Sequence, residues 1–203
     1  MSASEIRSLA RSLLDLCKMR KLMVATAESC TGGLVCAALV DIPGSSAVVA
    51  SGFITYSNEA KHDLLGVSSE TLATFGAVSK EAAIGMAKGA LKKGKADLAV
   101  SVTGIAGPGG ATPGKPVGLV HFAAAARDGR VITREKRFGA IGRTAVRTRS
   151  VVEALKLLTE LARGPARSAK AVKRPAPAAG RLRPRAARKP RQTAGTRRRT
   201  SRP

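Results

Sequence analysis

The sequence predicts a three-layer α/β/α domain with a mixed sheet, followed by a disordered basic C-terminal tail. Three observations carry this prediction. Apolar β-type runs alternate with helical patterns along the first 163 residues, and two of these runs end in glycine-rich loops. A hairpin pattern near the end of that segment predicts two antiparallel strands, which argues against an all-parallel sheet. We expect the domain over residues 1–163 and the tail over residues 164–203.

The chain opens with an amphipathic helix that should cover the sheet. Its apolar residues recur at steps of three and four, from Ile6 through Leu9 and Leu13 to Cys17. A short β-type run over residues 22–27 leads into residues 28–33, ESCTGG. Residues 34–40 are apolar nearly all round and precede a proline turn at 41–44, which predicts a buried helix.

The later elements follow from local signals. Residues 47–56 predict a second strand, and residues 58–65 predict a short helix that ends at Gly66. Ser68 and Ser79 are suitable N-caps for a brief helix and for a longer one that runs to about residue 92. Further expected elements are a third strand (98–102), a hairpin of 117–126 and 130–138 across Asp128-Gly129, and a final helix (141–162).

Charge is concentrated in the tail. The chain has 36 Lys and Arg against 13 Asp and Glu, and fourteen of the basic residues fall in 164–203, where no acidic residue occurs. Val172 and Leu182 are the only aliphatic residues there larger than alanine, so the tail should stay disordered. We expect nonspecific contact of this tail with polyanions or DNA, with a dedicated nucleic-acid role as the alternative. No aromatic residue is present there to stack on bases.

The cysteines and the hydropathy pattern bear on location. Cys17, Cys30 and Cys36 have spacings that suit neither a disulfide framework nor a zinc site, so we expect small core residues in a reducing compartment and no metal. No apolar run is long enough to span a bilayer, and the N-terminus lacks the pattern of a signal peptide. The expectation is a cytoplasmic protein without membrane contact.

Ser29 lies at a predicted strand-to-helix junction. Free N–H groups at a helix start favour developing negative charge, and Gly32 and Gly33 let a substrate approach the backbone. Ser29 or Thr31 could equally be a helix cap, so the junction alone does not decide between nucleophile and cap. The loop 103–110 also follows a strand and has four glycines, which could cradle a phosphate or serve only as a turn.

A serine nucleophile needs a base. His62 and His121 have no evident acidic partner in the sequence, so a Ser-His-Asp triad is unsupported. Lys61 is the alternative, although on sequence alone it could be one of many surface lysines. Arg143 and Arg147, one helical turn apart, could be surface residues or a phosphate clamp.

Together these segments resemble the CinA C-terminal domain family, whose characterised members are nicotinamide mononucleotide deamidases. The matching stretches cover about residues 4–162 and comprise residues 27–33, 43–46, 52–53 with 55–61, 76–79 and 102–110. The resemblance implies hydrolysis of the carboxamide of nicotinamide mononucleotide without a metal or organic cofactor. It implies a Ser-Lys dyad of Ser29 and Lys61. From this resemblance and from the two glycine-rich loops, we expect a further set of residues to bind the substrate or to support the dyad: Cys30, Thr31, Gly32, Gly33, Tyr56, Thr103, Gly104, Gly107 and Arg143.

The resemblance also suggests which groups bind the two ends of the substrate. We expect the amides near residues 30–32 to hold the oxyanion and Arg143 with the 103–110 loop to hold the phosphate. Many relatives have an acidic residue before the arginine of the last helix, where this chain has Gly142, and the tail lies outside the family pattern.

We expect a homo-oligomer. The alternative function is a noncatalytic nucleotide-binding module with a nucleic-acid-associating tail.

Overall fold

The computed structural model describes residues 2–164, so the tail expected over 164–203 lies outside the described residues except for Gly164. A five-stranded sheet forms the centre of this part, with strand order β2-β1-β3-β4-β5. Strands β1, β2 and β3 are parallel, and β4 and β5 form the antiparallel hairpin. The strands are β1 (Val24–Glu28), β2 (Val49–Ile54), β3 (Leu98–Gly104), β4 (Leu119–Ala126) and β5 (Val131–Arg137).

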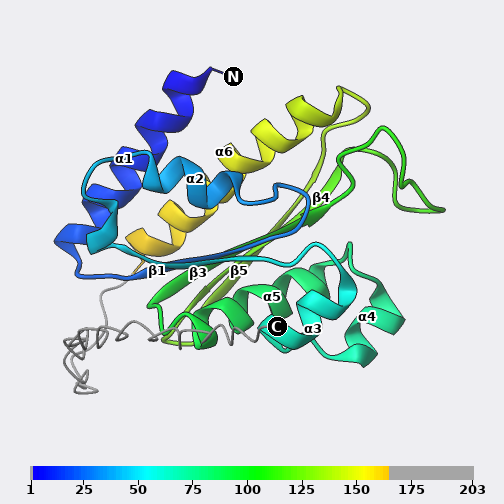
Figure 1. Ribbon diagram of the computed structural model, residues 1–203, viewed down its shortest axis with the longest axis horizontal. Coiled ribbons are helices and arrows are strands. Elements are labelled where there is room, and N and C mark those ends of the chain that lie inside the picture. The colour runs from blue at the N-terminus through cyan, green and yellow to red at the C-terminus, as the bar shows by residue number, and fades with distance from the viewer. Residues whose placement is uncertain (1, 165–203) are drawn as a thin grey trace, which may run out of the picture. The chain divides into compact units, whose positions relative to one another are not determined.

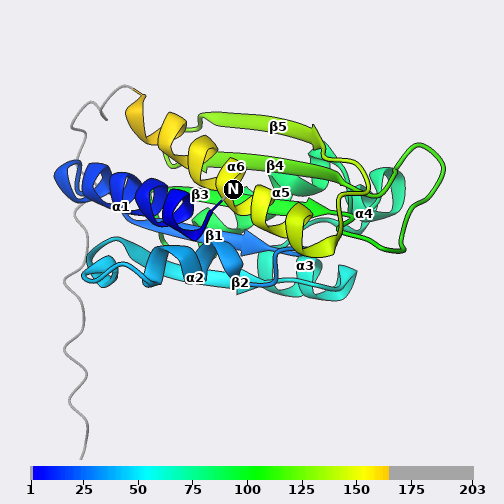
Figure 2. The same cartoon turned by 90° about the horizontal axis from the view of Figure 1, so that it is seen from above.

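Helices cover both faces of the sheet (Figure 1, Figure 2). One face carries α1 (Ala3–Met19), α2 (Leu34–Val40) and α6 (Arg143–Arg163), and the other carries α3 (Asn58–Leu65), α4 (Ser69–Phe75) and α5 (Lys80–Lys93). A single turn of 3₁₀-helix, Ser45–Ala47, lies between α2 and β2. The predicted three-layer α/β/α domain with a mixed sheet is confirmed.

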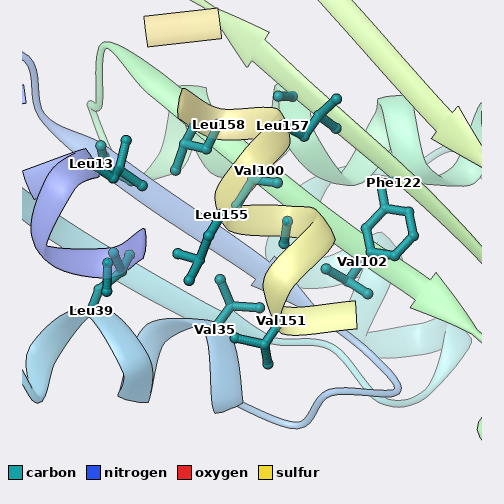
Figure 3. Packing of buried hydrophobic residues seen from close by; sticks show 14 of the residues in the cluster. Leu13, Val35, Leu39, Val100, Val102, Phe122, Val151, Leu155, Leu157 and Leu158 are labelled. Carbon is teal, nitrogen blue, oxygen red and sulfur yellow. The ribbon is translucent and has the colours of Figure 1, made fainter. Parts of the chain in front are cut away.

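The two layers of packing differ in side-chain size. Large aliphatic residues and Phe122 fill the space between the sheet and the layer of α1, α2 and α6 (Figure 3). Alanines dominate the opposite face, among them Ala25, Ala27 and Ala99. Small side chains let backbones approach closely. Consequently a Cβ added at Gly89 of α5 would lie 2.8 Å from the carbonyl carbon of Leu65, at the end of α3.

The predicted caps Ser68 and Ser79 are present, and Ser57 is a further cap that was not predicted. The hydroxyls of Ser57, Ser68 and Ser79 accept bonds from amides at the starts of α3, α4 and α5, at 3.0, 3.1 and 3.1 Å. The predicted strand 47–56 is shorter, because the 3₁₀ turn takes up its start. No helix within residues 2–164 combines the length and hydropathy needed to cross a membrane.

Helix α2 differs from the prediction of a helix buried on all sides. Only Val35 and Leu39 are buried, whereas Leu34 and Val40 are 37% and 54% exposed. The reason is position: α2 packs over β1 and β2, and β2 is an edge strand, so within residues 2–164 the outer side of the helix stays exposed. A continuous apolar run therefore did not mean complete burial here.

Candidate active site

Ser29 and Lys61 lie against each other at the carboxyl end of the parallel strands. Ser29 directly follows β1, and its amide donates to the carbonyl oxygen of Val102 on β3 at 2.9 Å. Lys61 is on α3, and its Nζ is 3.2 Å from Ser29 Oγ. The lysine is 1% exposed and the serine 8%. The interpretation of Lys61 as a surface lysine is therefore wrong.

Backbone carbonyl groups surround the Lys61 amine. Its Nζ donates to the carbonyl oxygen of Thr55 at 2.9 Å and lies 3.3 Å from that of Ser57 and 3.5 Å from that of Tyr56. Burial lowers the pKa of Lys61 below its ordinary value, and the Glu59 carboxylate partly opposes this. The amine thus has four oxygen partners within 3.5 Å, three carbonyl groups and the Ser29 hydroxyl.

The fully buried Glu28 carboxylate organises the turn that carries Ser29. It accepts bonds from the amides of Gly33 and Val35, both at 3.0 Å, and of Cys36 at 2.8 Å. The hydroxyl of Thr26 is a fourth donor at 3.2 Å. Glu28, the residue before Ser29, thus caps the start of α2. Gly33 precedes this helix with a φ of +98°, a conformation that glycine adopts readily.

This cap determines which amides remain available near Ser29. The Gly32 amide donates to the Ser29 carbonyl oxygen at 3.1 Å, and the Gly33 amide is bound to Glu28. Within residues 2–164, the amides of Cys30 and Thr31 have no backbone carbonyl or carboxylate acceptor. Of the amides of residues 30–32 that were expected to bind the oxyanion, those of Cys30 and Thr31 are therefore left, because the Gly32 amide already donates to Ser29.

Thr103 lies beside Ser29 on the same face of the sheet. Glu28 and Val102 are paired on β1 and β3, so the residues that follow them, Ser29 and Thr103, are neighbours. The buried Thr103 hydroxyl donates to the carbonyl oxygen of Ala77 at 2.7 Å. Gly104 comes next, where a Cβ would lie 2.7 Å from the Leu119 carbonyl oxygen, so this position accommodates only glycine.

Arg143 connects three segments at the rim. Its guanidinium donates to the Gly107 carbonyl oxygen at 3.0 Å and to the Tyr56 hydroxyl at 3.1 Å. Tyr56 is 63% exposed. A cavity of about 490 Å³ opens at the first turn of α6 beside Arg143, and its lining includes Thr144, Thr148 and Arg149. The cavity is lined by α6 and the residues before it, not by Ser29 or Lys61.

Arg147 turns inward from the same helix. It donates to the Thr31 carbonyl oxygen at 2.9 Å, so it supports the turn after Ser29. The Thr31 hydroxyl is buried and has no hydrogen-bond partner among residues 2–164, and the same is true of the Thr55 hydroxyl. Buried polar groups without a partner are costly, and both threonines are fully buried, so each hydroxyl costs stability in this state.

The histidines and cysteines lie in different surroundings. His62 is exposed and 2.9 Å from the neighbouring Asp63, and His121 lies 3.9 Å from Glu135 on β5, so the expectation that neither histidine has an acidic partner is wrong. Neither hydrogen-bonds Ser29 in the described part of the chain. Burial raises the pKa of the Cys30 thiol to about 12, which keeps it protonated beside Ser29. No cluster of three potential metal ligands occurs within residues 2–164.

Sequence reasoning missed the part played by Glu28 and by the carbonyl group of Thr55. An acidic residue between a buried strand and a glycine pair was a usable signal for a helix cap, since its side chain points at the free amides of the next helix. The carbonyl contacts to Lys61 carry no such signal, because backbone groups are identical at every position.

The sequence comparisons place the chain among known proteins. A profile of the family described as CinA C-terminal domain matches residues 6–162. The nicotinamide-nucleotide amidohydrolase PncC of Escherichia coli (strain K12) is 49% identical over 158 residues, which cover 78% of this chain and 95% of that protein. A CinA-like protein of Mycolicibacterium gilvum is 55% identical over 135 residues, which cover 66% of this chain and 32% of that protein. The chain thus spans about a third of one relative and nearly all of the other.

Solved structures agree with this placement. The competence/damage inducible protein CihA from Agrobacterium tumefaciens is 56% identical, with a TM-score of 0.76 over 77% of this chain and 95% of that one. A CinA superfamily protein from Klebsiella pneumoniae is 36% identical, with a TM-score of 0.74 over 77% and 97% of the two chains.

Proposed function

The chain belongs to the CinA C-terminal domain family, and on that basis we propose that it is an amidohydrolase that converts nicotinamide mononucleotide to nicotinic acid mononucleotide and ammonia. The support for this substrate is the 49% identity to a nicotinamide-nucleotide amidohydrolase, 95% of whose length the chain covers. The domain is assigned to residues 1–163, and the tail to residues 164–203.

The observation that carries the proposal is the buried Lys61 amine 3.2 Å from Ser29 Oγ. An unassisted serine hydroxyl is a poor nucleophile at neutral pH, and a lysine becomes a base when burial favours its neutral form. Burial does lower the pKa of Lys61. In its neutral form the amine can donate to carbonyl oxygens of residues 55–57 and keep its lone pair for the proton of the Ser29 hydroxyl.

The first half of the reaction forms an ester. Neutral Lys61 takes the proton of the Ser29 hydroxyl as Ser29 Oγ attacks the carboxamide carbon of the substrate. The amides of Cys30 and Thr31 donate to the oxyanion of the tetrahedral intermediate. Protonated Lys61 then gives its proton to the departing nitrogen, the carbon–nitrogen bond breaks, and ammonia leaves an acyl group on Ser29.

The second half hydrolyses this ester. Lys61, neutral again, takes a proton from water as the water oxygen attacks the acyl carbon. Lys61 returns the proton to Ser29 Oγ when the ester bond breaks, and nicotinic acid mononucleotide is released. The buried thiol of Cys30 takes no part, because its pKa of about 12 keeps it protonated.

Arg143 is assigned to the phosphate of the substrate, together with the 103–110 loop. A guanidinium has five N–H donors. Arg143 uses two, on Gly107 and Tyr56, so the others remain for a phosphate oxygen. Thr103 supports the dyad from the neighbouring strand, and Tyr56 holds Arg143 in place. The cavity beside Arg143 has the size of a small-molecule site.

The test is ammonia release from nicotinamide mononucleotide by the purified full chain, with chromatography to identify nicotinic acid mononucleotide. The expected result is equal amounts of both products, and Ser29→Ala is the matched blank. A folded wild-type protein that binds the nucleotide and releases no ammonia would instead support the nucleotide-binding module and overturn the enzyme.

A further inference from the structure

A groove of about 350 Å³ opens where α1, α2 and α6 meet. Apolar side chains from all three helices line most of it: Ile6, Leu34, Ala37, Ala38 and Val151. Neither Ser29 nor Lys61 lines it, so this groove is separate from the dyad.

The course of α1 explains why the groove is open. Apolar residues on one face of α1 recur at steps of three and four, and those from Ala10 to Cys17 are fully buried. The same face continues towards the N-terminus in Ile6 and Ala3, but Ile6 is only half-buried and Ala3 is exposed. The first turns of α1 lie farther from the sheet than its last turns (Figure 1). The apolar face of α1 thus extends past the described residues that cover it.

The opposite wall of the groove is the uncovered side of α2. Leu34 is 37% exposed, and Ala37 is exposed one turn further along the helix. The short side chains of Ala37 and Ala38 leave room in the groove for a side chain of another molecule. Contiguous apolar surface with a polar rim is typical of an interaction site.

Two side chains of opposite charge flank the groove. Arg7 is on α1 and Asp41 is at the C-terminal end of α2, and both are exposed. Among residues 2–164, neither of them is in an ion pair. A carboxylate at the C-terminal end of a helix is unfavourable next to the helix dipole, so α2 itself gives no reason for Asp41. A basic and an acidic group on the two walls of one groove suit a contact with a partner of complementary charge.

We infer that the groove is the contact surface for a second copy of the chain, related by a twofold axis, with Arg7 of each copy against Asp41 of the other. In a twofold contact, residue i of each copy meets residue j of the other, so one patch must supply both sides. This patch does so: the first turns of α1 supply an apolar face with a basic residue, and α2 supplies an apolar wall with an acidic residue. A small apolar molecule would fill the groove but leave both charges unpaired.

A second copy seated in the groove would contact both helices that lead from the proposed active site, and this step rests on the proposed function. Leu34 directly follows Gly33, one of the amides that the Glu28 carboxylate binds. Thr148 of α6 lines both this groove and the cavity beside Arg143. The second copy therefore restrains the first turns of α2 and α6, and ammonia release per chain should fall when the copies separate.

The test is the mass of the full chain, measured by light scattering during gel filtration. Wild type should have twice the chain mass of 20.9 kDa. Arg7→Glu and Asp41→Arg should each have the mass of one chain, because each variant brings like charges together in the contact. An equal mixture of the two variants should regain the double mass, because every contact between them then pairs opposite charges. This recovery also shows that both variants are folded.

Matched controls reverse exposed charges on the opposite helical layer, through Lys88→Glu and Glu70→Arg. Both controls should keep the double mass and the turnover of wild type. Variants at position 7 or 41 that keep the double mass, or a mixture that stays at the mass of one chain, would overturn the contact. A wild type with the mass of one chain would also overturn it, including where the groove binds the apolar probe 1-anilinonaphthalene-8-sulfonate.

Ammonia release from nicotinamide mononucleotide by the same samples tests the link to the active site. It should fall in the two separated variants and recover in their mixture. Unchanged turnover at the mass of one chain would overturn this link. The masses do not depend on turnover, so a lack of ammonia release from every sample would overturn the proposed function and leave the contact between copies standing.

Discussion

At the scale of single residues, the account depends on one buried amine. Lys61 is 1% exposed and its pKa is lowered by burial. In the unfolded chain the same amine titrates near its ordinary value of 10.5. Between the lowered pKa and 10.5 the unfolded state binds more protons than the folded state, so the free energy of unfolding rises with pH in this window.

Replacing Lys61 with Met removes this pH dependence. We expect wild type to gain stability relative to Lys61→Met as pH rises through the window, with a slope of at most about 1.4 kcal/mol per pH unit. Urea unfolding of both proteins at several pH values measures the difference. Parallel stability curves would mean that Lys61 has no lowered pKa. The kcat of wild type should also rise with pH as neutral Lys61 accumulates, and it should level off below 10.5, because burial lowers the pKa of Lys61.

Glu28 is the second residue with a large expected effect. Glu28→Gln replaces one acceptor oxygen with an NH₂ group facing amide donors, and bonds to charged groups contribute roughly 1.5–3 kcal/mol each. We expect the unfolding free energy to fall by roughly 2–3 kcal/mol. The kcat should fall about tenfold or more with little change in KM, because the turn that positions Ser29 loosens.

The control for Glu28 is Glu70→Gln. Glu70 is also acidic and in the first turn of a helix, but it is exposed. Its removal should cost no more than about 1 kcal/mol and leave kcat unchanged. If both substitutions have the same small effect, the buried cap does not position the serine.

At the scale of elements, the site depends on how closely α3 packs against α5. Gly89→Ala would place a Cβ 2.8 Å from the carbonyl carbon of Leu65, at the end of the helix that carries Lys61. We expect a loss of about 1–3 kcal/mol in unfolding free energy and slower ammonia release, because α3 must move away. Unfolding curves and turnover of the variant check this.

Gly85→Ala is the matched control in the same helix. The nearest atoms to a Cβ there belong to the Val67 side chain, at 3.4 Å. Alanine is the better helix former by about 1 kcal/mol, so this variant should be as stable as wild type or more stable, with unchanged turnover. Equal losses in the two variants would mean that the close approach of α3 and α5 does not position Lys61.

The elements also show what the sequence could predict and why the rest escaped it. Strand and helix order, the hairpin and two serine caps follow from local patterns, and the structure has these caps at Ser68 and Ser79. Burial depends on what lies above an element, so Leu34 and Val40 of α2 were placed wrongly. The burial of Lys61 arises from α3 packing against α5 and from its contacts with Thr55 and Ser29, which no local pattern in residues 58–65 encodes.

At the scale of the whole molecule, turnover and the basic tail should be separable. The chain cut after Gly164 keeps the carbonyl group that Arg20 binds, as well as every residue assigned to the site. We expect its kcat, KM and thermal midpoint to equal those of residues 1–203. A collapse of turnover or stability would show that the domain extends past residue 164.

The central claim is that Ser29 and Lys61 act as one catalytic pair. The most direct measurement is the rate of ammonia release from nicotinamide mononucleotide by Ser29→Ala and Lys61→Met, with His62→Gln as a neighbouring control. A lost base alone costs about 10²–10⁴-fold, so both dyad variants should fall by at least that factor, while the exposed His62 variant keeps the wild-type rate. Substantial turnover by folded Ser29→Ala or Lys61→Met would contradict the account.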